Sequence, residues 1–448
     1  MGAVKLVAVD MGYGHLRAAQ ALGDVIDQPV LYADRPPIAD GEELGKWRRT
    51  RWFYESISRA SQLGSFARPL RSLLEGVTSI PHLHPYRDLS APTLGVKGLR
   101  RMMRDGLGRG LVELMKAEHA GLLTTFYAPA IAADAAGLPG VTCVVTDADI
   151  NRIWAPPEAA RSEIDFCVPS VRAKLRLQSY GVRPEKIHLT GFPLPGELLG
   201  GPGLTALRKN LARRLLRLDP TGTFRDAYRD EVGHFLGELP AESDAAPLVT
   251  FAVGGAGSQS PLALTLLESF RRDIAEGRLR LALVAATHAG LEKEFLGGIK
   301  KLGLTEQLGA GVRVLYEAEL LTYFKSFNAL LAETDVLFTK PSEMTFFAAL
   351  GLPLVFSWPV GVHERYNRRW AIEGGAGLKQ RDPRFANEWI QEWLVDGSLA
   401  GAAWSGFMRL PKFGLYRILE QAGFAGAAVG DESEKLSPPA RPRELAES

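Results

Sequence analysis

The stretch VKLVAVDMGYGHLRAAQAL, residues 4–22, decides the fold. A run of β-branched and apolar residues ends at Asp10, and a glycine-containing turn then leads into helically spaced alanine and leucine from His15 onward. Strand, turn and helix in this order begin a parallel α/β unit. Gly12 and Gly14 allow a sharp turn, so we expect the helix N-terminus to point towards the edge of a sheet.

The same order recurs along the chain. Strand-like segments in the first half are GLLTT, VTCVVTD, DFCVPS and KIHLTG, and those in the second half are PLVTFAVGG, LRLALVAATH, GVRVLYEA, DVLFTK and GLPLVFSWP. Strands that alternate with helices predict doubly wound parallel sheets. We therefore expect an α/β protein with two Rossmann-like domains facing a cleft, in the segments 1–195 and 248–424, a helical bridge at 196–247 and a disordered tail at 425–448.

Length, charge and cysteine content limit the classes of protein to which the chain can belong. A chain of 448 residues suits two or three domains, and a net charge of +2 does not favour a nucleic-acid partner. The two cysteines, Cys143 and Cys167, lie in apolar strand-like surroundings, which excludes a disulfide framework and indicates a reducing cytoplasm. No apolar stretch approaches the roughly 20 residues that span a bilayer, so we expect any membrane contact to be peripheral, on the inner face.

A basic segment lies at residues 46–116, with fourteen basic and five acidic residues and a local net charge of +9. Within it, apolar residues recur at helical spacing beside three arginines: Leu99, Met103, Leu107, Leu111 and Leu114 beside Arg100, Arg101 and Arg104. A basic amphipathic helix can lie on an anionic bilayer. The alternative, a helix that faces the core and exposes a solvated basic face, is favoured for any one such helix.

Two groups of titratable residues follow strands of the first half. An imidazole at the position of His15 can accept a proton from a hydroxyl near neutral pH, although a histidine here can equally cap the helix or pack in the core. The glycine pattern around it is not the dinucleotide fingerprint. Asp147 and Asp149 form an Asp-x-Asp pair that can bridge a metal to phosphates. Carboxylates at strand ends more commonly cap turns, and we favour this interpretation without a metal.

Polar loops also follow strands of the second half. Gly254, Gly255, Gly257 and Ser258 leave backbone N–H groups unshielded before a helix, which suits a diphosphate, although one glycine cluster usually means a tight turn. Further on, Ser342 and Thr345 precede a helix, and a second polar loop follows the next strand. Together these loops predict a nucleotide-sugar pocket, although each residue alone can be a helix cap. The second polar loop contains His363, Glu364 and Asn367.

These motifs resemble one family. The stretches GYGHLRAAQAL, VVTDADINRIW, VRAKLRLQSYGVRPEKIHLTGFPL, FAVGGAGSQ and TKPSEMTFFAALGLPLVF, then NRRWAIEGGAG, lie in the expected order over residues 5–380. They resemble the GT-B glycosyltransferases related to monogalactosyldiacylglycerol synthase, processive diacylglycerol glucosyltransferases and the N-acetylglucosaminyltransferase that makes lipid II. The resemblance implies an acceptor-side first domain, a second domain that binds a uridine-diphosphate sugar, and transfer without a cofactor or a metal site.

The resemblance also implies roles for particular residues. His15 would lie near the reacting acceptor, with Gly12, Gly14, Asp147 and Asn151 on the acceptor side. The donor would be bound by the residues of the later loops: Gly254, Gly255, Gly257, Ser258, Ser342, Glu343, Thr345, His363, Glu364 and Asn367.

The chain departs from the family pattern at the donor loop. Ala348 stands where the family has a glutamate that holds the ribose, and Glu343 offers a carboxylate from a different position. Asn151 replaces a histidine, and His363-Glu364 replaces a Gln-Glu pair. These changes put the identity of the donor, and donor binding itself, in question.

Three functions follow from these motifs. The leading hypothesis is a hexosyltransferase that moves a sugar with inversion from a nucleotide-diphosphate sugar, with a UDP-sugar as the expected donor, to an acceptor hydroxyl; the basic segment suggests a lipid-linked acceptor. The first alternative is a nucleotide-sugar epimerase or hydrolase on the same fold. The second is a non-catalytic nucleotide-sugar-binding protein, which the alanine at position 348 suggests. Fold alone does not separate them.

Overall fold

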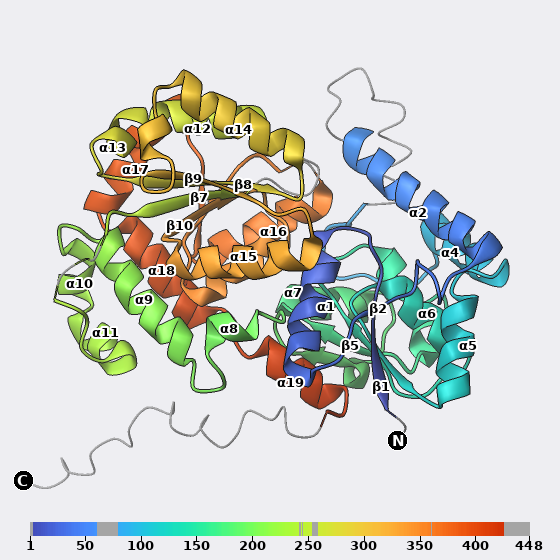
Figure 1. Ribbon diagram of the computed structural model, residues 1–448. Helices are drawn as coiled ribbons and strands as arrows, with labels where there is room; N and C mark the ends of the chain where they lie inside the picture. The colour runs from blue at the N-terminus through green and yellow to red at the C-terminus, as the bar shows by residue number, and fades with distance from the viewer. Residues whose placement is uncertain are drawn as a thin grey trace, which may run out of the picture.

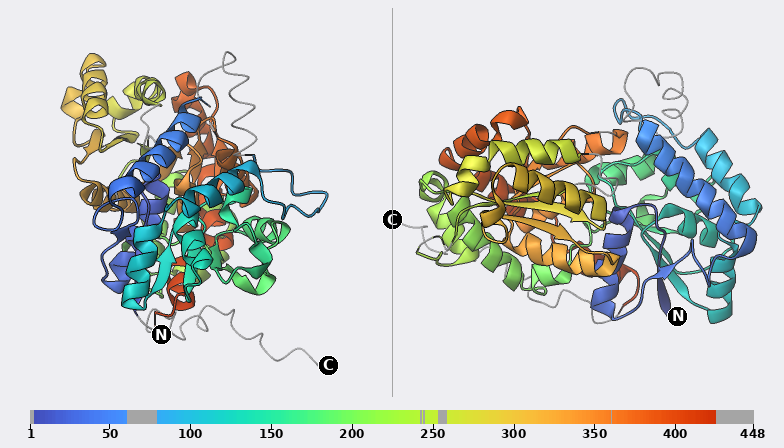
Figure 2. Two further views of the ribbon diagram at one scale, coloured as in Figure 1. Left: turned by 90° about the vertical axis from the view of Figure 1, so that its right-hand side faces the viewer. Right: turned by 45° about the horizontal axis from the view of Figure 1, so that its top comes forward.

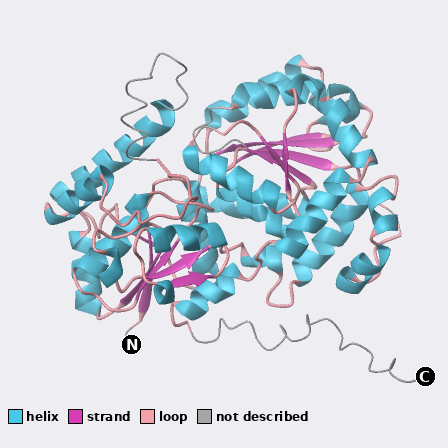
Figure 3. Ribbon diagram, turned by 180° about the vertical axis from the view of Figure 1, so that it is seen from behind, coloured by secondary structure: helices cyan, strands magenta, loops and turns pink. Residues whose placement is uncertain are grey.

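The computed structural model describes residues 3–60, 79–241, 243, 245–252, 259–359 and 361–424, without the side chains of residues 52–60. Two lobes lie side by side, and each is built around its own six-stranded parallel sheet (Figures 1 and 2). Helices cover both sheets, which are separate when seen from behind (Figure 3). The sequence predicts this arrangement of two α/β domains with doubly wound parallel sheets.

The first sheet has the strand order β2-β1-β3-β4-β5-β6. The order reverses between β1 and β3, which pair directly, so the switch point of this sheet lies at their carboxyl ends. The sequence did not reveal β2, because its two residues are too few for an alternating pattern. The strands are β1 (Val4–Ala8), β2 (Leu31–Tyr32), β3 (Gly121–Thr124), β4 (Val141–Val144), β5 (Asp165–Val168) and β6 (Ile187–Leu189).

The second sheet has the order β12-β11-β10-β7-β8-β9, the arrangement of a Rossmann sheet. Its switch point lies between β7 and β10, which are also direct neighbours. The sequence predicted five of these strands and missed β12, which is short and amphipathic. The strands are β7 (Leu248–Ala252), β8 (Arg280–Ala286), β9 (Val312–Tyr316), β10 (Val336–Thr339), β11 (Leu354–Phe356) and β12 (Gly377–Lys379).

Helices cover both faces of the first sheet because its strands are apolar on both sides. Leu6 and Ala8 face a core that continues into the second domain, whereas Val7 and Val9 face a core of their own with Trp47. The helices of this half are α1 (Tyr13–Ile26), α2 (Gly41–Ala60), α4 (Leu94–Arg104), α5 (Arg109–Glu118), α6 (Tyr127–Ala135) and α7 (Val171–Ser179), with short 3-10 helices at Arg152–Trp154, Ala159–Arg161 and Pro184–Lys186.

Four helices connect the two sheets, and one of them is tied closely to the second domain. Arg214 of α9 donates to the carbonyls of Thr334 and Leu350, at 2.8 and 3.0 Å, and burial lowers the pKa of its guanidinium to about 10. The connecting helices are α8 (Gly196–Leu199), α9 (Thr205–Leu218), α10 (Thr223–Ala227) and α11 (Arg229–Leu236). The boundaries of the bridge at 196 and 247 stay a prediction.

The second half ends with a helix that returns to the first domain. In α19 (Gly414–Gln421), Gly414 lies directly against the backbone of Gly191 and Phe192, and Leu415 approaches Gly196. The other helices of this half are α12 (Ser260–Ser269), α13 (Arg271–Ala275), α14 (Ala289–Lys301), α15 (Leu320–Glu333), α16 (Val362–Glu373), α17 (Ala386–Val395) and α18 (Ser398–Arg409), with 3-10 helices at Thr305–Gln307, η6 (Glu343–Leu350) and Pro383–Phe385.

The basic segment does not form one amphipathic helix through Leu99 and Leu114. Gly106 and Gly108 have φ values of 101° and 83°, which end α4 and separate it from α5. The apolar residues largely face the core, since Leu99, Leu107 and Leu111 are buried, while the arginines alongside are exposed. For these two helices the core-facing interpretation is confirmed. Residues 61–78 of the segment and the predicted tail at 425–448 lie outside the described residues.

Two further expectations concern compartment and membrane. Cys143 and Cys167 are buried and not joined by a disulfide. Among the helices of the described residues, none has the length and apolar character needed to cross a bilayer.

Close packing of α18 against η6 generates a stability prediction. A Cβ at Gly406 would clash with the carbonyl oxygen of Ala348, whereas a Cβ at Gly401 of the same helix would meet only an edge of Phe224 at 4.0 Å. We expect Gly406→Ala to lower the free energy of unfolding by about 1–3 kcal/mol through overpacking. The matched variant Gly401→Ala should leave it unchanged or raise it by up to about 1 kcal/mol. Urea denaturation measures both, and equal stabilities would contradict this packing.

Candidate active site at the domain interface

His15 lies at the switch point of the first sheet. It belongs to the first turn of α1, after Gly12, whose φ of 124° is favourable only for glycine. Its Nδ1 is 2.7 Å from the carbonyl oxygen of Thr125, the residue after β3, and 3.2 Å from the Thr146 hydroxyl. Since a carbonyl can only accept, Nδ1 carries a proton, and in the neutral ring Nε2 keeps its lone pair.

The surroundings of His15 favour the neutral ring. Burial lowers the pKa of the imidazole, and a nearby His363 acts in the same direction. The carboxylates of Asp147 and Glu343, with the hydrogen bond to Thr125, raise this pKa without restoring its ordinary value. His15 is therefore a neutral base at physiological pH, with its basic nitrogen directed away from Thr125.

Residues of the second domain lie directly against the N-terminus of α1. A Cβ at Gly14 would lie 3.1 Å from the Cβ of Glu343, which follows β10, and the Tyr13 hydroxyl is 2.7 Å from the hydroxyl of Thr287, which follows β8. The two switch points therefore face each other, as the sequence predicted for its glycine turn and later polar loops. Here the facing loops are in contact rather than separated by an open gap.

Asn367 of α16 joins the loops of the two sheets. Its Oδ1 accepts from the backbone N–H of Ala148 at 2.8 Å, and its Nδ2 donates to Asp147 Oδ1 at 3.0 Å and to the Pro341 carbonyl at 3.3 Å. Asn367 is completely buried. The side chain predicted to bind the donor thus closes the interface in this arrangement; its role towards a donor stays a prediction.

Lys340 is a candidate site residue that the sequence motifs did not predict. It follows β10 directly, and its Nζ lies 3.1 Å from Glu364 Oε1. Burial alone would lower the pKa of Lys340, but Glu364, helped by Glu343 and Asp147, raises it more, so the ammonium stays charged. A lysine directly after a buried strand at a switch point is the signal that would have found it.

Three predicted site residues carry buried polar atoms without a hydrogen-bond partner among the described residues. These atoms are Asn151 Oδ1, Ser342 Oγ and Thr345 Oγ1. Buried polar groups are rarely left unpaired in a native protein, because each costs about 1–3 kcal/mol. All three belong to residues that the sequence predicts to bind a ligand, and this role stays a prediction.

The local structure of the donor loop differs from the sequence prediction. Thr345 does not precede a helix but lies within η6, and it is completely buried. Ala348 is also completely buried, and its carbonyl faces α18, so position 348 does not line the interface. The carboxylate that does reach the interface from this loop belongs to Glu343. The physical reason is that η6 runs directly into the core instead of exposing one side.

The remaining residues of the predicted donor site differ in exposure, and some lie outside the described residues. His363 is exposed and Glu364 buried, and both lie in the first turn of α16 rather than in a loop. Gly254, Gly255, Gly257 and Ser258, predicted to lie by the donor diphosphate, are outside the described residues.

Asp147 and Asp149 do not share a site. Asp149 is buried and binds the Arg172 and Arg176 guanidinium groups at 2.6 and 2.8 Å, whereas Asp147 faces Asn367. Two cations thus compensate the buried Asp149 carboxylate, as burial of a charge requires. Within the described part of the chain, no three or more His, Cys, Asp or Glu side chains are grouped so as to hold a metal ion.

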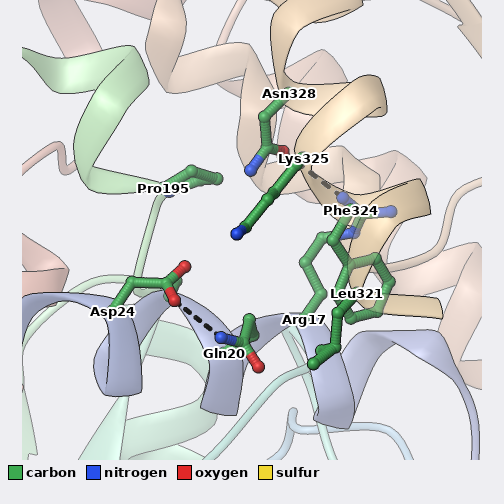
Figure 4. A pocket seen from close by; sticks show the side chains of 9 residues that line it. Arg17, Gln20, Asp24, Pro195, Leu321, Phe324, Lys325 and Asn328 are labelled. Atoms are coloured by element: carbon green, nitrogen blue, oxygen red, sulfur yellow. Dashed lines mark hydrogen bonds between the residues drawn. The ribbon is translucent and has the colours of Figure 1, made fainter. Parts of the chain in front are cut away.

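A second contact fixes α1 one turn further along the helix. The guanidinium of Arg17 is buried over the rings of Phe324 and Phe327 of α15, 4.5 and 4.7 Å from their centroids. Its Nη1 is 3.4 Å from Asn328 Oδ1, and Figure 4 shows Arg17 beside Phe324 and Asn328. A cavity of about 90 Å³ lies beside it, with Lys325 on its wall. Cation–π contacts of a desolvated guanidinium are worth about 2 kcal/mol. Arg17 therefore anchors α1 to the second domain.

Comparison with known proteins found one family model that matches part of the chain. Residues 301–417, less than half of the chain, match a family model described as a domain of unknown function (DUF6938). No curated protein matches the sequence.

Solved structures similar to the chain are distant. A co-structure of S. aureus MnaA with UDP is 12% identical, with 94% of this chain and 95% of that chain covered and a TM-score of 0.48. Acinetobacter baumannii MurG is 13% identical, with coverages of 92% and 98% and a TM-score of 0.47. The spinosyn rhamnosyltransferase SpnG with thymidine diphosphate is 14% identical, with coverages of 93% and 100% and a TM-score of 0.45.

The environment of His15 predicts its titration. We expect its imidazole to have a pKa below the ordinary value of 6.5, because burial disfavours the charged ring. The ring resonances followed by NMR against pH measure this, with His15→Gln to assign the signal. Titration at or above the ordinary value would show that the carboxylates of Asp147 and Glu343 outweigh burial and that His15 is not a neutral base.

Proposed function

We propose that the chain is a GT-B glycosyltransferase that moves a hexosyl group, with inversion, from a nucleotide-diphosphate sugar to an acceptor hydroxyl. A UDP-sugar is the proposed donor, and no separate cofactor takes part. The observation that most supports this proposal is the position of His15. His15 lies at the switch point of one sheet, and the neighbouring Gly14 lies against Glu343, which follows β10 at the switch point of the other; parallel α/β sheets bind their ligands at such points.

The chemistry assigns one step to each group. His15 Nε2 takes the proton of the acceptor hydroxyl while its oxygen attacks the anomeric carbon from the face opposite the diphosphate. The bond from that carbon to the diphosphate oxygen breaks, and the electron pair leaves with the diphosphate. Lys340, the charged residue after β10, offsets the negative charge of this leaving group. We assign this role to Lys340 rather than to a metal on Asp147 and Asp149, because Arg172 and Arg176 occupy Asp149.

Substrate entry requires the interface to open. Glu343 lies against Gly14, and Asn367 joins the loops of the two sheets, so both contacts must separate before a sugar can reach His15. A bound donor would give a partner to the orphaned hydroxyl of Ser342, which is only half-buried. Loop and domain motions of this kind occur on microsecond-to-millisecond timescales.

A lipid-linked acceptor, with cytoplasmic location and peripheral membrane contact, is the finer form of the proposal. It is supported by the surface of α4, where Leu94 is 78% exposed next to the exposed Lys97, Arg100, Arg101 and Arg104. Exposed apolar and basic side chains together favour an anionic bilayer surface.

Replacement of His15 tests the transferase. We expect His15→Ala to lower the rate of UDP release from UDP-glucose, UDP-galactose or UDP-N-acetylglucosamine by about 100-fold or more, because the base is lost. Diacylglycerol vesicles and soluble alkyl glycosides serve as acceptors. Calorimetric binding of UDP should stay unchanged, and His234→Ala, on the remote helix α11, is the matched control. Unchanged release by His15→Ala would remove this residue from the mechanism.

One observation favours an epimerase or hydrolase instead. Asp147 and Glu343 lie near His15 at a closed interface, so a proton can be removed and returned without an acceptor. The transferase proposal predicts no product from the same UDP-sugars without acceptor, and no deuterium in the recovered sugar after incubation in D₂O. A new sugar isomer or a carbon-bound deuterium, seen by NMR, would establish the epimerase, and free sugar the hydrolase. Binding of UDP-sugar without turnover under any condition would establish a binding protein.

A further inference from the structure

A second cavity lies outside the proposed active site. It has a volume of about 490 Å³ and lies between the loop after β2 and the first half of α2. Its lining combines three arginines and one aspartate with apolar side chains: Asp34, Arg35, Pro36, Leu44, Trp47, Arg48 and Arg51. A cavity of this size can hold a small polar molecule or the head of a larger one.

Two of its arginines are held in place by carboxylates behind them. Arg35 Nη2 binds Asp10 Oδ2 at 2.5 Å, and Arg51 Nη2 binds Asp34 Oδ2 at 2.7 Å and Asp10 Oδ2 at 3.2 Å. Asp34 is almost completely buried, so it anchors Arg51 from within the protein. These bonds use one nitrogen of each guanidinium, and the two side chains remain 44% and 38% exposed. Each keeps further N–H donors for a ligand.

The third arginine makes no ion pair with any other described residue. Arg48 is exposed on α2, one residue after the buried Trp47. The indole N–H of Trp47 points to Glu43, 3.2 Å away, so its polar edge is already paired. The side chains that line the cavity thus include three guanidinium groups and one carboxylate, that of Asp34, so the lining carries a positive net charge.

The cavity lies at the carboxyl edge of the first sheet, next to the turn that carries His15. Asp10, which holds both Arg35 and Arg51, precedes Gly12 by two residues. Ligands of parallel α/β sheets bind at this edge.

We propose that this cavity binds a phosphate group. Guanidinium groups match phosphate oxygens with paired N–H donors, and three such groups suit a dianion with several oxygens better than a single carboxylate, which one arginine satisfies. The positive net charge disfavours a cationic ligand. The phosphate belongs either to a soluble phosphate ester or to a phospholipid headgroup, since both present the same chemistry to Arg35, Arg48 and Arg51.

Calorimetric titration with inorganic phosphate, at constant ionic strength, tests this site independently of sugar transfer. We expect Arg48→Ala to weaken phosphate binding about tenfold, the size of one charge-assisted hydrogen bond. Arg49→Ala removes the same charge from the next, exposed position of α2, which does not line the cavity, and should change the affinity less than about twofold. Arg48→Lys should restore part of the affinity, and His15→Ala should bind as the unaltered protein does.

Two results of this titration would overturn the proposal. One is the absence of saturable phosphate binding by the unaltered protein. The other is an equal loss in Arg48→Ala and Arg49→Ala, which would show only general attraction by the basic surface. Failure of the transferase test with intact phosphate binding would leave this site standing, so the two proposals fail separately.

The source of the phosphate is distinguished by two further probes. Competition by glycerol 3-phosphate, sensitive to Arg48→Ala, would identify a soluble ester. Sedimentation with phosphatidylglycerol vesicles but not with phosphatidylcholine vesicles, lost in Arg48→Ala and kept in Arg49→Ala, would identify a headgroup. Binding of neither probe would contradict the proposal, because the site would then accept only the bare ion.

Discussion

The N-terminal turn of α1 is held from both domains, and the candidate site depends on this constraint. On one side, His15 Nδ1 is bonded to the carbonyl after β3. On the other, Tyr13 and Arg17, one helical turn apart, pack against aromatic rings of α15. The positive φ of Gly12 directs the helix into this position. The position of His15 therefore depends on the association of the two domains as much as on the fold of the first domain.

Charge at the interface is balanced between the domains. Lys340 lies close to Glu364, and its pKa also responds to Glu343 and to Asp147 of the first domain. Charges in a protein interior interact more strongly than in water, so this arrangement favours the closed state. In the proposed mechanism, opening would expose the same groups to solvent, and a phosphate-bearing donor would replace the carboxylates as partner of Lys340. The contacts that close the interface and those that would bind a substrate are thus made by the same residues.

The basic side chains of α2, α4 and α5 occupy two different kinds of position. In α4 and α5 the arginines are solvated while Leu99 and Leu111 face the core, as in ordinary surface helices; Leu94, at the start of α4, is exposed. At the start of α2, by contrast, Arg48 and Arg51 line a cavity whose shape comes from Trp47 and from the loop after β2. The net charge of a segment shows that basic side chains are abundant in it. Only the tertiary structure shows which of these side chains lie close enough to line one cavity.

The sequence by itself determined the two sheets, most of their strands and the polar residues that follow them. Apolar runs and glycine turns such as Gly12 specify these features because each depends only on residues close together in the chain. His15 could be selected in the same way. The tertiary structure alone decided that Asn367 bonds to Ala148, that Glu343 rather than position 348 reaches the interface, and that Lys340 belongs to the site. Such contacts join residues that are far apart in the chain, and no periodicity or spacing in the sequence encodes which of them meet.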